Sequence, residues 1–382
     1  MIKIIKIIAL ILSCRPSLLV AKPLKIKTVF HAGFATSRAT FCEIMMPLME
    51  QHGVVFVDNN PDVVLMCGRL AKTQKAFKVP CILLSDAEPA SLTQDLKYKL
   101  RDPNLLAVFK NTTLRPKVLY NQAEDYPRYI LENSYLQKRT SHEPSLEGAN
   151  VSVSEPKLSN SQCDKIYTIL WDIYRSAVSP NLKDIATSNI DFKTKRGIDV
   201  FFVGRVKTFY EHRMLLYEKL TTLQQLSKNL NIVAPTTCLE KSDYIELLKK
   251  SKIAISPWGV AEWCWRDYEA IYCGCVLIKP DTSFVQSVPD LYQNYKYYIP
   301  CKADFSDLGE KINYVIKNYK KLTPMRKKAL KHLAEHWNYK KIASDLVVAI
   351  KRVLRANGCL PDTKRPSRGK LHDRRWPKKD TK

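Results

Sequence analysis

The organisation of the chain is clearest in residues 253–281, IAISPWGVAEWCWRDYEAIYCGCVLIKPD. Residues 253–255 and 275–278 are short apolar runs of the kind that form buried strands. Between them, residues 263–273 suit a helix, and Gly274 stands where many helices end in a left-handed glycine. A strand, a loop, a helix and a second strand, in this order, form the unit from which parallel sheets are built. The stretch therefore predicts an α/β domain.

Three charged side chains of this stretch are spaced for one helix face. Glu262, Arg266 and Glu269 lie at positions i, i+4 and i+7. In open α/β sheets, ligands bind beyond the carboxyl ends of the strands and at helix N-termini. An arginine fork suits paired phosphate oxygens, and a carboxylate can accept hydrogen bonds from two neighbouring hydroxyls. The same spacing also fits a surface salt bridge between Glu262 and Arg266 with Glu269 in solvent, and the spacing alone leaves both interpretations open.

The rest of the chain alternates in the same way. Strands are predicted at residues 25–30, 54–57, 63–66, 80–84, 105–109, 198–203, 231–234 and 297–299. Helices are predicted at residues 38–52, 163–176, 210–226, 242–251, 305–319, 323–336 and 340–354, with Ser242 as an N-cap. The expected fold class is α/β, with two Rossmann-like domains and mostly parallel sheets.

Shifts in composition suggest boundaries between these parts. Residues 137–162 are polar and rich in serine, which is typical of a linker or loop. The segments expected are a cationic apolar N-terminal segment (1–23), an α/β domain (24–136), the linker (137–162), an inter-domain helical segment (163–196), a second α/β domain (197–356) and a basic disordered tail (357–382).

The formal net charge of +25 is large. Nine Lys/Arg and three Asp give the last 22 residues +6, so +19 belongs to the body of the chain. A basic body favours an anionic partner, which is a membrane lipid, a nucleic acid or a phosphorylated substrate. A lysine-rich surface without such a partner is the alternative.

Several familiar sites are missing from the sequence. The 11 cysteines include no C-x-x-C pair, which indicates a reducing compartment and no structural metal site. A P-loop and the Rossmann G-x-G-x-x-G are also absent, so bound phosphate would depend on arginine side chains and a helix N-terminus. Residues 1–12, MIKIIKIIALIL, fit a membrane-surface segment or a signal peptide. We therefore expect a cytoplasmic protein that can lie at a membrane surface, with the secretory pathway as the alternative.

The runs SPWGVAE (256–262) and RDYEAIYCGCVLIKPD (266–281), together with FVGR (202–205), resemble the C-terminal domain of GT-B glycosyltransferases. The group-1-like branch, with its Arg-x-Phe/Tyr-Glu-Ala-x-x-Cys-Gly core, is the most similar. The resemblance implies two domains that face a cleft, with the nucleotide-sugar donor bound by the C-terminal domain and the acceptor by the N-terminal domain.

By this resemblance, Glu269 would hold the donor ribose, and Arg266 and Arg205 would meet the diphosphate. Glu262 would lie near the donor sugar, although its spacing of seven from Glu269 departs from the eight of the better-known retaining pattern. Two further cations, Arg213 and Lys279, are candidates for the phosphates. For Arg213, a solvated helix position is the alternative.

The acceptor side offers candidates for a general base at predicted strand ends. His31 follows the strand at 25–30, and Asp86 and Glu88 follow the strand at 80–84. A base beside the acceptor hydroxyl is usually Asp, Glu or His. Each of the three residues fits this role by position alone.

The expected activity is transfer of a sugar from a nucleotide sugar to a glycan or lipid-linked acceptor, in cell-surface polysaccharide or glycoconjugate synthesis. No cofactor is expected, and a metal is not required, because basic side chains and a helix dipole can offset the charge of the leaving diphosphate. An anionic membrane surface is a further expected partner, and a nucleic acid is not. The alternatives are a non-enzymatic basic nucleic-acid-binding protein and an inactive sugar-nucleotide-binding module.

Overall fold

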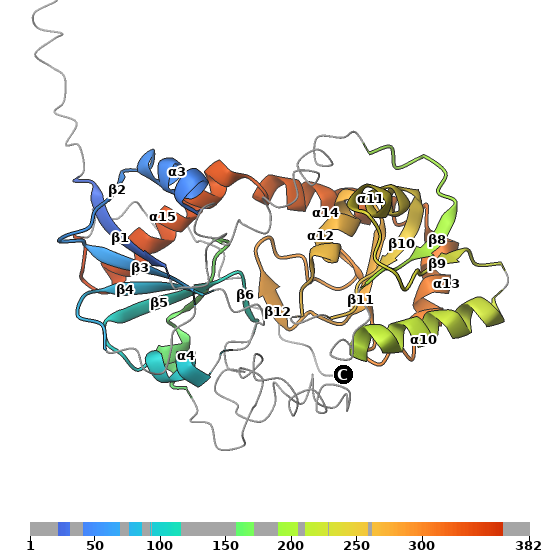
Figure 1. The fold of residues 1–382 in the computed structure, drawn as a ribbon, viewed down its shortest axis with the longest axis horizontal. Helices are drawn as coiled ribbons and strands as arrows, with labels where there is room; N and C mark the ends of the chain where they lie inside the picture. Colours follow the sequence, from blue (N-terminus) through green and yellow to red (C-terminus); the bar gives the residue numbers. More distant parts are fainter. Residues whose placement is uncertain are drawn as a thin grey trace, which may run out of the picture.

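The computed structural model describes residues 22–30, 41–68, 76–85, 92, 94–115, 158–171, 190–204, 211–227, 229–258 and 262–361. They form two lobes, each built on a parallel sheet, which lie side by side in Figure 1. We call them the N-terminal lobe and the C-terminal lobe. The α/β architecture with two parallel sheets that the sequence predicts is confirmed.

The N-terminal sheet has six strands in the order β2-β1-β3-β4-β5-β7, and every pairing is parallel. The five strands predicted for this part of the sequence are all present. Their apolar residues alternate into a buried core or, in the central strands β4 and β5, fill both faces of the sheet. The strands are β1 (Leu24–Phe30), β2 (Val54–Phe56), β3 (Val63–Gly68), β4 (Cys81–Ser85), β5 (Leu105–Lys110) and β7 (Ile166–Thr168).

Helices from both ends of the chain cover this sheet. A π-helical turn η1 (Phe41–Met45) and α3 (Met46–Glu50) stand where a helix is predicted, and α4 (Gln94–Lys99) is an addition. The last helix, α15 (Tyr339–Ala356), returns from the C-terminal lobe and buries its apolar face in the core shared with β1 and β3. In Figure 1 it crosses, in red, beside the blue strands.

The helix predicted at residues 163–176 is wrong at its start. A short helix α7 (Asn160–Cys163), capped by Ser159, ends there. Ile166–Thr168 then forms β7 and pairs with β5. Ile, Tyr and Thr favour strands, and the edge of the sheet gives this segment a partner that helical spacing alone does not reveal.

The C-terminal sheet has the order β13-β11-β10-β8-β9 and is also parallel throughout. Its strands are β8 (Ile198–Phe201), β9 (Ile232–Val233), β10 (Ser251–Ile255), β11 (Val276–Pro280) and β13 (Ile299–Cys301). The last strand begins two residues later than predicted. Its helices are α10 (Glu211–Leu226), α11 (Lys241–Lys250), α12 (Trp265–Tyr272), α13 (Leu308–Asn318) and α14 (Thr323–His336).

The ends of these helices follow the sequence in part. Gly274 has a φ of +69° directly after α12, as the predicted helix end requires. The predicted N-cap Ser242 is wrong, because α11 begins one residue earlier and its N-cap is Glu240.

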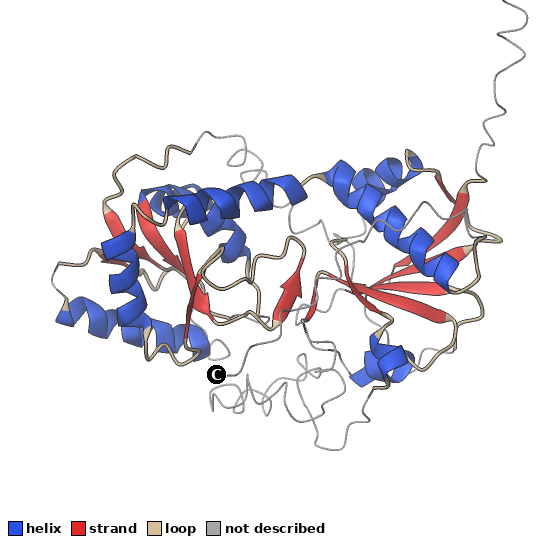
Figure 2. Ribbon diagram, turned by 180° about the vertical axis from the view of Figure 1, so that it is seen from behind, coloured by secondary structure: helices blue, strands red, loops and turns tan. Residues whose placement is uncertain are grey.

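A two-stranded antiparallel ladder joins the lobes. It pairs β6 (Thr112–Leu114), directly after β5, with β12 (Val285–Ser287), which follows β11. Figures 1 and 2 show it between the two sheets. Next to it, both Nη atoms of Arg115 donate to the Asp290 carboxylate, at 2.5 and 3.1 Å. Because β5 and β11 run into this ladder, the carboxyl edges of both parallel sheets adjoin the junction between the lobes.

Within the described residues, no helix is both long enough and apolar enough to cross a membrane.

Candidate functional site

Two arginine side chains converge at the carboxyl end of β8. A Cβ on Gly204 would lie 3.2 Å from Nη2 of Arg266 and 3.3 Å from Cδ of Arg213, so glycine makes room for both. The Tyr217 hydroxyl accepts a hydrogen bond from the Gly204 amide at 3.2 Å and donates to the Pro235 carbonyl at 2.7 Å. Burial raises the pKa of Tyr217, and the charges of both arginines act against this rise. The strand end is therefore a point of concentrated positive charge.

Arg266 belongs to the first turn of α12 and is only 8% exposed. Its Nη2 donates to the carbonyl of Val203 at 2.5 Å, and the guanidinium carbon lies 5.0 Å from the centre of the Phe202 ring. Its Nε is buried without a hydrogen-bond partner among the described residues. The guanidinium group is thus held against the end of β8, with donor capacity left unused.

Glu269 lies one turn further along α12. Its Oε2 accepts a hydrogen bond of 2.8 Å from the hydroxyl of Tyr244, which comes from α11. Burial raises the pKa of the Glu269 carboxyl, whereas the Tyr244 hydrogen bond and the charge of Arg266 lower it. The other oxygen, Oε1, accepts no hydrogen bond from the part of the chain that the structure describes. One carboxylate oxygen is therefore anchored by Tyr244.

Glu262 does not share the helix with these residues. α12 begins at Trp265, so Glu262 lies in the preceding loop, where it is 3% exposed. The predicted positions, Glu262 in the loop and Arg266 and Glu269 on the helix, are therefore confirmed. The surface salt-bridge alternative also fails, because Glu262 and Arg266 are both buried.

Lys279 contacts a different partner. Its Nζ lies 3.3 Å from Oδ2 of Asp267, and both side chains are fully buried. The same oxygen accepts hydrogen bonds from the Tyr292 hydroxyl at 2.8 Å and from the Cys264 amide at 3.0 Å. Lys279 thus ties β11 to the start of α12.

His212, at the start of α10, links the loops that follow β10 and β13. Its Nδ1 accepts a hydrogen bond of 3.1 Å from the Trp258 amide, after β10, and its Nε2 donates to the Ala303 carbonyl, after β13, at 2.7 Å. The ring stacks on Phe305 at 4.6 Å. Burial lowers the pKa of His212 to about 4, so the ring is neutral at pH 7. His212, the residue before Arg213, is therefore a neutral side chain that hydrogen-bonds to two loops.

Four predicted site residues, Arg205, His31, Asp86 and Glu88, lie outside the described residues. The strands that precede them do not. β8 ends shortly before Arg205, β1 ends at Phe30, and β4 ends at Ser85. β1 and β4 are parallel and separated by β3, so both end at the carboxyl edge of the N-terminal sheet.

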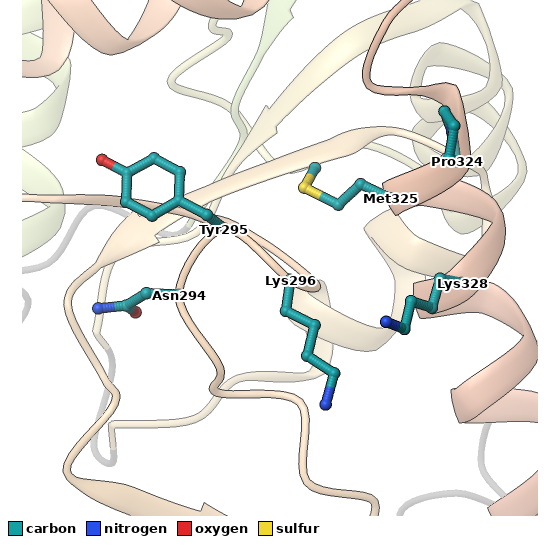
Figure 3. Close-up of a pocket in the computed structure, with 6 residues that line it drawn as sticks. All are labelled: Asn294, Tyr295, Lys296, Pro324, Met325 and Lys328. Atoms are coloured by element: carbon teal, nitrogen blue, oxygen red, sulfur yellow. The ribbon is translucent and has the colours of Figure 1, made fainter. Parts of the chain in front are cut away.

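A hollow beside α14 lies apart from these residues. It is lined by Asn294, Tyr295, Lys296, Pro324, Met325 and Lys328 (Figure 3). Its lining includes none of the predicted site residues.

No protein-family model matches the chain, and no curated protein matches it either. Among solved structures, a glycosyltransferase from Rickettsia africae ESF-5 is similar at 12% identity and a TM-score of 0.43, over 88% of this chain and 99% of that one. An α1,3-fucosyltransferase with GDP is similar at 14% identity and a TM-score of 0.41, over 89% and 92%. A putative UDP-N-acetylglucosamine 2-epimerase from Listeria monocytogenes is similar at 11% identity and a TM-score of 0.40, over 87% and 97%. At these values, the comparisons assign no function to this chain.

Proposed function

We propose that this protein is a glycosyltransferase that binds a nucleotide sugar in its C-terminal lobe. The observation that carries the proposal is the convergence of Arg213 and Arg266 over Gly204, with Glu269 one turn along the same helix as Arg266. Guanidinium groups suit the paired oxygens of a diphosphate, and a partly anchored carboxylate suits a ribose diol. The group-1-like motif of residues 266–275 points to the same assignment.

In this proposal the donor diphosphate lies at the carboxyl end of β8, beside the N-terminus of α12. The arginines and the helix dipole would stabilise the negative charge that develops on the leaving diphosphate. Tyr244 would orient Glu269 so that Oε1 faces the ribose hydroxyls. Arg205 would add a third cation at the same strand end.

The acceptor would enter from the N-terminal lobe. His31, Asp86 and Glu88 are the candidates for the base that takes the proton of the acceptor hydroxyl, since the strands before them end at the edge next to the lobe junction. We propose a glycan or lipid-linked acceptor, in cell-surface polysaccharide or glycoconjugate synthesis, with the basic body of the chain at an anionic membrane surface.

The test begins with the purified full chain and a set of UDP- and GDP-sugars in a thermal-shift screen, since a ligand that binds the native state raises the melting temperature. Calorimetry with the best nucleotide then compares Glu269→Gln with Glu246→Gln. Glu246 is a matched control, because it is an exposed glutamate of the neighbouring helix α11 that pairs with Lys250. We expect about a tenfold loss of affinity for Glu269→Gln, which corresponds to about 1.4 kcal/mol, and none for the control.

Equal affinities of the two variants would remove Glu269 from the site. Turnover is measured separately, as release of the nucleotide from the sugar donor. Donor binding without any release, across a panel of acceptors, would support the inactive binding module instead. Tight, steeply salt-dependent binding of a random oligonucleotide, with no response to nucleotide sugars, would support a nucleic-acid-binding protein.

A further inference from the structure

The last turn of α14 carries three potential metal ligands. The sequence there is HLAEH, residues 332–336, so that His332, Glu335 and His336 lie at positions i, i+3 and i+4 of one helix face. Their ligand atoms all lie within 4.8 Å of one another. Two histidines four residues apart on a helix are a known way to hold zinc.

The tautomer of His336 is fixed in the form that a metal needs. Its Nδ1 lies 2.8 Å from the carbonyl of His332. A carbonyl can only accept, so Nδ1 carries the hydrogen and Nε2 keeps its lone pair. Histidines that bind metals usually donate their second N–H to a carbonyl or a carboxylate in this way.

His332 has an unused polar atom in the same place. Its Nε2 is buried and has no hydrogen-bond partner among the residues that the structure describes. A buried nitrogen without a hydrogen bond is unfavourable, so a group that satisfies it is favoured. The ring itself is held by stacking on Tyr297, with centroids 4.7 Å apart and planes 3° apart.

We propose that His332, Glu335 and His336 bind one divalent zinc ion, with water as the fourth ligand. Two imidazole nitrogens and one carboxylate oxygen suit zinc, whereas calcium and magnesium prefer oxygen ligands throughout. The neighbouring charges are mixed: Asp290 and Glu335 favour a cation near His332, and Lys296 opposes it. Lys296 and Lys328 line the hollow of Figure 3. Lys328 lies one turn before His332 on α14.

The proposed zinc site lies just before the passage from α14 to α15. Trp337 follows His336 directly and packs on α12, 4.9 Å from Tyr268 and 6.1 Å from Trp265. After Trp337 the chain enters α15 and crosses to the N-terminal lobe. Zinc would bind the last turn of α14 just before this crossing. The proposal does not depend on the proposed transferase activity.

The test uses the untagged full chain, stripped with EDTA, dialysed and titrated with Zn²⁺ alone. We expect one equivalent of zinc by elemental analysis. We expect at least about a tenfold rise in Kd for His336→Gln, since even residues that only support a ligand change metal affinity 10- to 100-fold. His52→Gln, an exposed histidine of the N-terminal lobe, is the matched control and should bind zinc like the unsubstituted chain.

Co²⁺ separates this site from the cysteines. A histidine and carboxylate site gives visible bands without the thiolate charge-transfer absorption that cysteine ligands produce. Zinc binding that is equal in His336→Gln and His52→Gln overturns the proposal, and so does a thiolate signature. Glu335→Gln provides a second variant on an exposed side chain, and it should weaken binding without a loss of the fold.

Discussion

His212 makes the stability of the C-terminal lobe depend on pH. Its two ring nitrogens are both used, one as an acceptor from the Trp258 amide and one as a donor to the Ala303 carbonyl. A second proton on the ring would have to displace the Trp258 amide, in a buried place that also faces the charge of Lys279. The folded protein therefore resists protonation of His212, and the unfolded chain does not.

The sign and size follow from the two pKa values. Burial lowers the pKa of His212 from 6.5 to about 4 in the folded state. Between these values the unfolded state binds one proton more than the native state, so stability falls as the pH falls. At pH 5 the contribution is a loss of about 2 kcal/mol relative to pH 7.5, and it approaches about 3 kcal/mol near pH 4.

The assay is urea unfolding at pH 7.5, 6 and 5, for the unsubstituted chain and for His212→Gln. Other titrating groups, including Glu269 with its raised pKa, act in both proteins and cancel in the difference. The unsubstituted chain should lose about 2 kcal/mol more than the variant between pH 7.5 and pH 5. Parallel pH profiles of the two proteins would refute the buried neutral state of His212.

Two further predictions concern α12 and its neighbours. Lys279→Met leaves Asp267 as a buried, uncompensated charge and should lower the free energy of unfolding by about 3–5 kcal/mol. The double change Lys279→Met/Asp267→Leu should lower it clearly less, because no buried charge is left unpaired. Urea unfolding of both variants measures the difference. Gly274→Ala should be more destabilising than Gly358→Ala in thermal unfolding, although both glycines have a φ near +70°. The added Cβ would meet side chains at 3.0 Å at Gly274 and nothing within 4 Å at Gly358, so equal melting temperatures would contradict the packing around Gly274.

Local pattern predicts most of the fold because most of its strands are buried on both faces. Runs such as Cys81–Ser85 and Leu105–Lys110 are buried throughout and apolar except for their last residue, and the turns between them are polar. The strands that the sequence did not predict are those whose partners are remote in sequence. β6 pairs with β12, about 170 residues away, and each contributes a single apolar residue, Leu114 and Val285, to the core. The helical spacing of residues 163–176 likewise does not predict β7. This strand forms because it can pair with the edge of β5.

The candidate site could also be predicted only in part, where its residues are close in sequence. Arg266 and Glu269 are three residues apart on one helix, so spacing is enough to bring them together. Their partners come from other elements: Gly204 from the end of β8, and Tyr244 from α11. Asp267 stands inside the same motif, but its burial and its pairing with Lys279 are visible only in the structure. The HLAEH spacing is visible in the sequence, but only the structure shows that His332 Nε2 lacks a partner.

Two connections join the lobes, and one of them contacts the helix of the candidate site. One is the β6–β12 ladder with the Arg115–Asp290 pair, where the carboxyl edges of both sheets come together. The other is the passage from α14 to α15, where Trp337 packs on α12. α12 also carries Arg266 and Glu269, so Trp337 packs on the helix of the candidate site. The proposed zinc would bind one residue before Trp337, in this second connection.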